Sequence, residues 1–377
     1  MQQNHETFLI SLVSVIVAFV IPFLANLDGR NQRAPISRKF SSRITPWHSV
    51  MSHDIYHDGW CRVNLRCNMA SFKRIVEIIK LKWSEVNNPI GRNAFFLHRE
   101  RVAVTMHYLS HSGSIRDSAQ CFGMGKASAL RYVDEVLRVI ISMKSSVIYF
   151  PKSSEQLCSI ANEFEQIAGF PNVVGAIDGT LIEIQRPFDY EGWYCRKGYC
   201  AFNVQAICDA KRRFLSFSIF PGSMNDKSMY KLSTFGKTCH QFIPSDKQLL
   251  GDAGYMLQNH LLIPYDIFEL MPADQKHYNY IHSKTRIAIE GAFGILKQRF
   301  RILNTTLNQK SLTGMSDVIQ ACFVLHNIFI EMNDDVSFDL SMGNLNDNHE
   351  NELYGVTSTR TGYHKREQIK SYLASVN

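Results

Sequence analysis

Three acidic residues stand where the surrounding sequence is apolar. Asp178 follows "VVGAI", Asp252 follows "QLL" between two glycines, and Glu290 lies in the first turns of "TRIAIEGAFGILKQRFRIL". A buried carboxylate is costly unless a cation balances it. Hard divalent ions such as Mg²⁺ or Mn²⁺ prefer carboxylate oxygens as ligands. We therefore interpret Asp178, Asp252 and Glu290 as candidate catalytic, metal-binding residues.

The chemistry of such a site is phosphoryl transfer. Two divalent ions about 3.5–4 Å apart activate a water or hydroxyl on one side of a phosphodiester and stabilise the leaving oxygen on the other. Taken singly, each acid has a structural alternative. The two aspartates fit turn or cap positions, and Glu290 fits an ion pair with Arg286 or Lys297.

Positive charge gathers around the third acid. Residues 276–301 contain six lysines or arginines and one acidic residue, Glu290, within a chain of net charge +7. Phosphate neutralisation is one use of such a cluster. A second basic group is interleaved with aromatic residues near position 196, although aromatic core packing is the commoner reason for that pattern. The candidate DNA contacts are Arg196, Lys197, Lys284, Arg286, Lys297, Arg299 and Arg301.

The elements that must position these side chains form an alternating pattern after Pro171. Strands are predicted over 172–184, 201–210 and 213–220, joined by short connections as in an antiparallel meander. They are followed by a helix from Asp226 to about Thr234, a short strand "QLLGD", the helix that carries Glu290 and a last helix over about 316–332. The helix that carries Glu290 has an apolar face that is expected to pack on the sheet, formed by Ile289, Phe293, Leu296 and Phe300. This order predicts an α/β fold, a mixed sheet flanked by helices in a ribonuclease H-like catalytic core.

Residues 65–150 have helical periodicity. Phe72, Ile75, Val76, Ile79 and Leu81 are predicted to form one buried face. The stretch "SGSIRDSAQCFGMGKASALRYVDEVLRVIISM" predicts a helix capped by Ser114, a glycine turn and a longer helix whose inward side includes Leu130. That outline is helix-turn-helix-like, with an ordinary helical hairpin as the alternative.

The two ends of the chain differ in character. Residues 7–27 carry no charge, form a segment long enough to span a bilayer and are followed by basic residues. The alternative is an apolar helix that packs on the protein. The nine cysteines show no zinc or disulfide spacing and favour a reducing compartment. We expect an apolar segment and linker over 1–50, a helical domain over 51–150, a nuclease domain over 165–332 and a polar, flexible tail over 333–377.

Six blocks of the sequence resemble one known family. The blocks "GAIDGT", "YCRKGYCAFNVQAICD", "PGSMNDKSM", "LLGDAGY", "TRIAIEGAFGILKQRFRIL" and "ACFVLHNIFIE" are similar, in order and style, to the PIF/Harbinger superfamily of DDE transposases and the nucleases descended from them. The resemblance is strong over about 170–331. It implies a ribonuclease H-like core and two divalent metal ions bound by the DDE triad, which falls on Asp178, Asp252 and Glu290.

The resemblance also implies partners. DNA is the expected substrate, in the nucleus, and a separate Myb-like protein is the expected main DNA reader, so the helix-turn-helix-like region becomes an accessory or protein-contact element. A homodimer stays open. Asp226 in "PGSMND" is a fourth acid of the family pattern, expected to cap a helix or to support the metal ligands from behind.

Two further functions remain open from the sequence. The chain can be a domesticated protein that keeps the fold as a chromatin or protein-binding module without cutting DNA. The apolar segment 7–27, which a nuclear transposase does not need, leaves a membrane-anchored protein as the other alternative.

Overall fold

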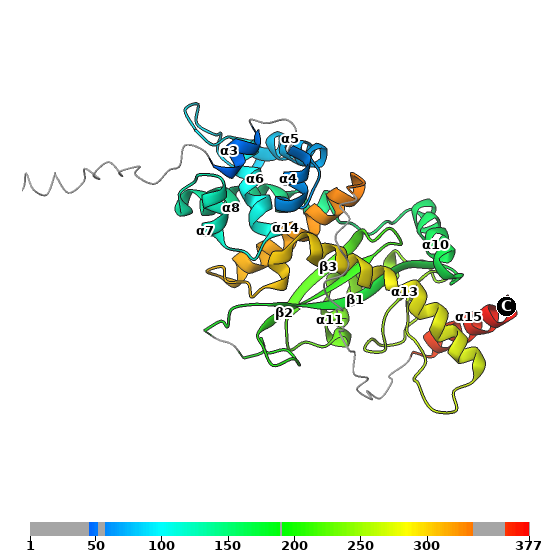
Figure 1. Ribbon diagram of the computed structural model, residues 1–377. Helices are drawn as coiled ribbons and strands as arrows, with labels where there is room; N and C mark the ends of the chain where they lie inside the picture. Colours follow the sequence, from blue (N-terminus) through cyan, green and yellow to red (C-terminus); the bar gives the residue numbers. More distant parts are fainter. Residues whose placement is uncertain (1–44, 52–56, 189–190, 335–358, 377) are drawn as a thin grey trace, which may run out of the picture. The chain divides into compact units, whose positions relative to one another are not determined.

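A five-stranded mixed sheet organises the part of the chain that the computed structural model describes, which comprises residues 45–51, 57–188, 191–334 and 359–376 (Figure 1). Its strand order is β3-β2-β1-β4-β5. The first three strands pair antiparallel, whereas β4 runs parallel to β1 and β5 parallel to β4. The strands are β1 (Val173–Glu183), β2 (Ala201–Cys208), β3 (Phe214–Pro221), β4 (Gln248–Leu250) and β5 (Leu261–Leu262). The predicted meander and the mixed α/β fold are confirmed.

The register of β1 and β4 explains where Asp178 lies. Ala176 of β1 is level with Leu250, the last residue of β4, so β1 continues beyond the end of its parallel neighbour. Asp178 lies two residues further along and faces Ala206 of β2. Asp178 therefore lies within β1, as the strand predicted over 172–184 implies, because the pairing with β2 carries β1 on to Glu183.

Helices precede the sheet, as predicted. Ser114 caps the helix that follows it, as predicted, by accepting a hydrogen bond from the Asp117 amide. The helices are α3 (Pro46–Met51), α4 (His57–Asn64), α5 (Met69–Val86), α6 (His98–Ser110), α7 (Ile115–Cys121), α8 (Lys126–Ser142), α9 (Lys144–Val147) and α10 (Ser154–Ala168).

Two residues predicted to face inward on these helices point to solvent. Leu81 is 76% exposed, because Trp83 supplies the next position on the buried stripe of α5. Leu130 is 38% exposed, because its neighbours Ala129 and Val133 take the inward positions of α8.

The helix that carries Glu290 is longer than predicted. It is α13 (Ala273–Arg299), which begins directly after Pro272, so Glu290 lies in its second half rather than in its first turns. Buried Tyr278 and His282 extend the inward face toward the N-terminus within an otherwise polar stretch. The other elements of this half are α11 (Asp226–Leu232), α12 (Thr234–Thr238), the 3₁₀ helices η3 (Cys239–Gln241) and η4 (Arg301–Asn304), α14 (Leu312–Glu331) and α15 (Arg360–Ser375).

One hydrophobic core joins the N-terminal helices to the sheet. The predicted apolar face of α13, Ile289, Phe293, Leu296 and Phe300, is buried, and the Phe293 ring lies 5.7 Å from that of Phe214 in β3. Helix α14 packs against both β3 and α8. Among the described helices, α14 is the one long and apolar enough to cross a membrane, but it is mostly buried in this core.

The prediction of a flexible tail is wrong over 359–376, where the chain forms the C-terminal helix. Helix α15 buries Ile369 and Leu373 and packs against α13 and β5 (Figure 1). The ammonium of Lys365 donates hydrogen bonds to three backbone carbonyls, and the Arg366 guanidinium lies 3.9 Å from the centre of the Tyr265 ring. The sequence did not reveal these contacts, because Lys365 and Arg366 are cationic side chains whose hydrocarbon parts are buried.

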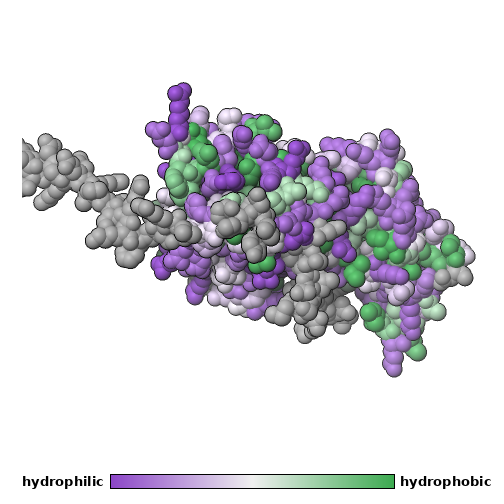
Figure 2. Space-filling model, turned by 45° about the horizontal axis from the view of Figure 1, so that its top comes forward, coloured by the Kyte–Doolittle hydropathy of each residue, from purple (hydrophilic) through white to green (hydrophobic). Residues whose placement is uncertain are grey.

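The surface and the cysteines fit a protein with this core. Figure 2 shows a mostly hydrophilic face on which hydrophobic side chains gather in small groups. All nine cysteines are free. The apolar segment 7–27 lies outside the described residues, so its role stays a prediction.

Candidate active site

Asp178 projects from β1 into a buried polar site. Its residue is 4% exposed. One carboxylate oxygen, Oδ1, accepts the amide N–H of Gly179 at 2.7 Å, and Oδ2 accepts Nη1 of Arg286 at 2.8 Å. The second contact joins β1 to α13, so the first predicted acid and the helix of the third are brought together.

Arg286 bridges Asp178 and Glu290. Its Nη2 donates to Oε1 of Glu290 one helical turn further along α13. Burial acts to lower the pKa of Arg286, but the carboxylates of Asp178, Glu290 and Asp252 outweigh it and raise that pKa above its usual value. The predicted role of Arg286 as a DNA contact is corrected, because its buried guanidinium is engaged by these acids.

Asp252 and Asp226 meet beside two glycines. A Cβ atom on Gly254 would lie 3.2 Å from Oδ2 of Asp226 and 3.2 Å from Oδ1 of Asp252, whose Oδ1 accepts the Gly254 amide N–H. A Cβ atom on Gly179 would lie only 2.7 Å from Oδ1 of Asp226. A side chain at Gly179 would push the Asp226 carboxylate aside, and one at Gly254 would press on both acids.

The pKa values of Asp226 and Tyr255 reflect how close the acids lie to each other. Burial, followed by the charges of Asp252 and Asp178, raises the pKa of Asp226 to about 7, although Arg196 opposes the shift. Burial and the charges of Asp226, Asp178 and Asp252 also raise the pKa of the Tyr255 hydroxyl well above its usual value. Asp226 thus lies among the predicted acids, and the charges of Asp252 and Asp178 disfavour its ionisation.

The expected role of Asp226 as a helix cap is wrong. Asn225 caps α11 by accepting the Ser228 amide, and Asp226 is the first helical residue, with its side chain directed toward the other acids.

Two amides on β2 hold the segment that carries Asp226. Asn203 donates to the carbonyl of Met224 at 2.9 Å, and Gln205 donates to the carbonyl of Asp226 at 3.2 Å. The same Gln205 Nε2 donates to the Tyr255 hydroxyl at 3.0 Å. Gln205 therefore links the start of α11 to the turn that carries Asp252. Sequence reasoning missed this pair, although polar residues at alternate positions of the apolar strand "AFNVQAIC" were a signal.

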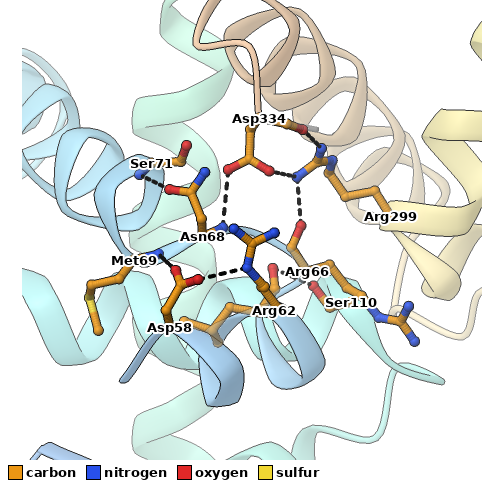
Figure 3. Close-up of polar contacts among 10 residues, drawn as sticks. Asp58, Arg62, Arg66, Asn68, Met69, Ser71, Ser110, Arg299 and Asp334 are labelled. Carbon is orange, nitrogen blue, oxygen red and sulfur yellow. Dashed lines mark hydrogen bonds and ion pairs between the residues drawn. The ribbon is translucent and has the colours of Figure 1, made fainter. Parts of the chain in front are cut away.

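Arg299, another predicted DNA contact, is an interior residue. It is 2% exposed, and its guanidinium donates to the carbonyl of Arg66 and to both the side chain and the carbonyl of Asp334 (Figure 3). Asp334 also accepts the amide N–H of Asn68. This cluster ties the end of α13 to the α4–α5 connection, so the DNA-binding prediction for Arg299 is corrected.

The other predicted DNA contacts are more accessible. Lys297 is half-buried and donates to the carbonyl of Leu181 in β1. Those exposed to solvent are Arg196, Lys197, Lys284 and Arg301.

The donor set fits a hard divalent cation. The carboxylates of Asp178, Glu290 and Asp252 act on the Arg286 guanidinium, and that of Asp226 lies beside Asp252. Negative charge remains in excess even with Arg196 near Asp226. Carboxylate oxygens are the ligands that Mg²⁺ and Mn²⁺ prefer. As they stand, however, the described His, Cys, Asp and Glu side chains form no group of three or more around a common metal position. The ion pairs of Arg286 give a reason, because they direct Asp178 and Glu290 toward the guanidinium.

Known proteins share this sequence pattern. Residues 177–327, which include all four acids, match the model of the DDE superfamily endonuclease family. "Putative nuclease HARBI1" of Rattus norvegicus is 30% identical over 71% of this chain and 78% of its own, and the Homo sapiens protein of that name is 29% identical over the same shares. "Protein ALP1-like" of Arabidopsis thaliana is 29% identical over 69% of this chain and 66% of its own.

These matches define the class as DDE superfamily endonucleases. Within it, the chain belongs to the family of the Harbinger transposase-derived nucleases, as the sequence blocks predicted. A solved piggyBac transposase synaptic complex with hairpin DNA aligns with 86% of this chain and 82% of its own at a TM-score of 0.34 and 11% identity, which is too low to establish a shared fold.

Proposed function

We propose that this protein is a divalent-metal-dependent DNA endonuclease or transposase. In this proposal Asp178, Asp252 and Glu290 hold two Mg²⁺ or Mn²⁺ ions, and Asp226 joins them as a fourth ligand. The observation that carries the proposal is the convergence of Asp226, Asp252 and Asp178, which come from three separate segments. Burial and the charges of Asp252 and Asp178 raise the pKa of Asp226, and acids perturbed in this way cluster at functional sites.

The residues of the chain have distinct tasks in such a reaction. When bound, the metal ions would activate a water or a freed 3′ hydroxyl and stabilise the leaving oxygen of the phosphodiester. The carboxylates of β1, α11 and the turn after β4 supply the ligand oxygens. Gln205 fixes two of these segments relative to each other, and Gly179 and Gly254 keep the space between them open.

A ribonuclease H-like core is part of the proposal. It is supported by three antiparallel strands followed by two parallel ones on the far side of β1, with an acid on β1 and another directly after β4. Because parallel neighbours end at the same edge, the register alone brings Asp178 and Asp252 to one level.

DNA contact is proposed for the exposed cations. Arg196 lies close enough to Asp226 to lower its pKa, so the segment with Arg196 and Lys197 borders the acids. Lys284, Lys297 and Arg301 of the α13 region would add phosphate contacts, which neutralise backbone charge without reading sequence. We assign sequence reading to a Myb-like partner protein and an accessory role to α7 and α8.

Cleavage of terminal-repeat DNA tests the proposal. The full-length protein, with and without a Myb-like partner, is incubated with the DNA in Mg²⁺ or Mn²⁺. We expect metal-dependent strand breaks that Asp178→Asn and Asp252→Asn abolish while circular dichroism shows an intact fold. Full activity of Asp252→Asn would rule out the assignment.

One observation favours a second function, a non-cleaving chromatin or protein-binding module. Arg286 already neutralises part of the charge on Asp178 and Glu290, as a protein that no longer needs metal would require. Calorimetric titration with Mn²⁺ together with a nicking assay separates the two functions. Mn²⁺ binding with nicking supports the nuclease, whereas a folded protein that never nicks DNA supports the module.

A further inference from the structure

Arg286 occupies the position of a counter-ion inside the candidate active site. Its side chain is 11% exposed, and it contacts one carboxylate on β1 and another on its own helix. Both oxygens of Asp178 are engaged, Oδ1 by the Gly179 amide and Oδ2 by Arg286. A metal ion that takes Oδ2 of Asp178 in the observed orientation must therefore displace the guanidinium or turn the carboxylate.

The charge of this guanidinium is permanent. Arginine stays protonated in proteins, so Arg286 cannot make way for a metal by losing a proton. It can leave only by moving its side chain. The same carboxylates would be claimed by a divalent ion, which binds oxygen ligands at much shorter distances than a hydrogen bond allows.

We propose that Arg286 is a built-in competitor of the divalent metal, so that metal binding and departure of the guanidinium from Asp178 and Glu290 are one exchange. The inference rests on the proposed function, since it assumes that these carboxylates bind metal. In the metal-free protein Arg286 keeps the acids in a low-charge arrangement. The apparent metal affinity is then reduced by the fraction of molecules in which Arg286 is bound to them.

A purely structural ion pair makes the opposite prediction. If Arg286 only fixes α13 against β1, its removal loosens two ligands and weakens metal binding. If it competes, its removal strengthens metal binding even though the metal-free protein becomes less stable. Metal affinity therefore separates the two roles, whereas stability alone does not.

The test is titration of the full-length, chelator-treated protein with MnCl₂ by calorimetry. We expect Arg286→Gln to bind Mn²⁺ about tenfold tighter than the unmodified protein. Arg286→Lys keeps the charge but can reach one carboxylate at a time, so its affinity should lie between the two. Arg62→Gln is the matched control, because it removes an arginine from another i,i+4 pair, with Asp58, and should leave Mn²⁺ affinity unchanged.

Each outcome decides the inference. Equal or weaker Mn²⁺ binding by folded Arg286→Gln overturns it, and if that variant does not fold, unchanged affinity of Arg286→Lys overturns it. If the unmodified protein binds Mn²⁺ and the Arg286 variants bind it with the same affinity, the exchange is overturned but the proposed function is not. Absence of Mn²⁺ binding in every variant overturns the metal-dependent function itself.

Discussion

Helix α13 carries two buried arginines that meet very different surroundings. At its C-terminal end, Arg299 pairs with the carboxylate of Asp334, and its Nη1 and Nη2 also donate to the backbone carbonyls of Arg66 and Asp334 (Figure 3). Among the described residues, one carboxylate is paired with this guanidinium. In the middle of the helix, Arg286 faces an excess of carboxylates.

The contrast shows what distinguishes a structural ion pair from a binding site. A buried pair of one cation and one carboxylate holds elements together without a further counter-ion. A site in which Asp178, Glu290 and Asp252 act on one guanidinium, with a fourth acid beside Asp252, retains a negative charge that a bound cation would neutralise. The location of the imbalance, rather than the presence of a buried arginine, identifies the candidate active site.

Removing Arg299 should have the largest effect on stability. Arg299→Leu leaves the fully buried Asp334 side chain without its cation and should lower the free energy of unfolding by about 3–5 kcal/mol. Chemical denaturation measures the change, and saturating Mn²⁺ should not restore the loss. The control is Arg62→Leu at an exposed pair, where we expect less than about 1 kcal/mol. A small loss for Arg299→Leu would remove the contrast.

Removing one of the excess acids should have the opposite sign. Asp226→Asn relieves repulsion from Asp252 and Asp178 and should stabilise the metal-free protein by about 1–2 kcal/mol near pH 8. Thermal unfolding in chelator checks this, with Asp266→Asn, at an exposed acid, as the control for loss of one negative charge. Destabilisation by Asp226→Asn would mean that the acids are already balanced.

The amide that links two acid-bearing segments should affect metal binding. Gln205→Leu should weaken Mn²⁺ binding about tenfold, as losses of hydrogen bonds behind metal ligands do. Gln248→Leu is a matched control, because Gln248 is also a buried amide that donates to a backbone carbonyl, but that of Pro171. Equal Mn²⁺ affinities for the two variants would show that Gln205 serves stability alone.

A buried histidine on α13, His282, gives the smallest effect. Burial lowers the pKa of His282, one turn before Arg286 on α13, to about 3, with a smaller contribution from Arg286. The unfolded state protonates His282 near pH 6.5, whereas the folded state resists protonation down to about pH 3. The free energy of unfolding is therefore highest above pH 6.5 and decreases as the pH falls toward 3. The loss is about 0.7 kcal/mol between pH 7 and 6. Chemical denaturation at the two pH values should show that His282→Gln removes this contribution to the pH dependence of the free energy of unfolding. An unchanged pH dependence would contradict the assignment.

Local patterns predicted much of the fold and the identity of the acids. The strands were recognisable because apolar, β-branched runs end at glycines and charged turns, and the aspartates followed from their place beside Gly179 and Gly254. The inward face of α13 followed from helical spacing of Ile289, Phe293 and Leu296.

Long-range pairing was beyond local patterns. Nothing near Arg299 in the sequence reveals that its partners lie at Arg66 and Asp334, so it looked like one more basic residue of a DNA-binding helix. The cap expected at Asp226 was wrong for the same reason, since the direction of its side chain depends on how α11 docks on β2. The start of α13 and the order in α15 were missed because tertiary contacts stabilise helices whose composition is polar.

The most direct test of the central claim, that the excess of carboxylates forms a divalent metal site, is Mn²⁺ binding to the full-length protein and to Asp252→Asn. Asp252 is the best probe because it contacts the Gly254 turn and belongs to neither ion pair of Arg286. The account predicts saturable Mn²⁺ binding by the unmodified protein and binding at least about tenfold weaker in folded Asp252→Asn. Identical Mn²⁺ binding by the two proteins, or none by either, would contradict it.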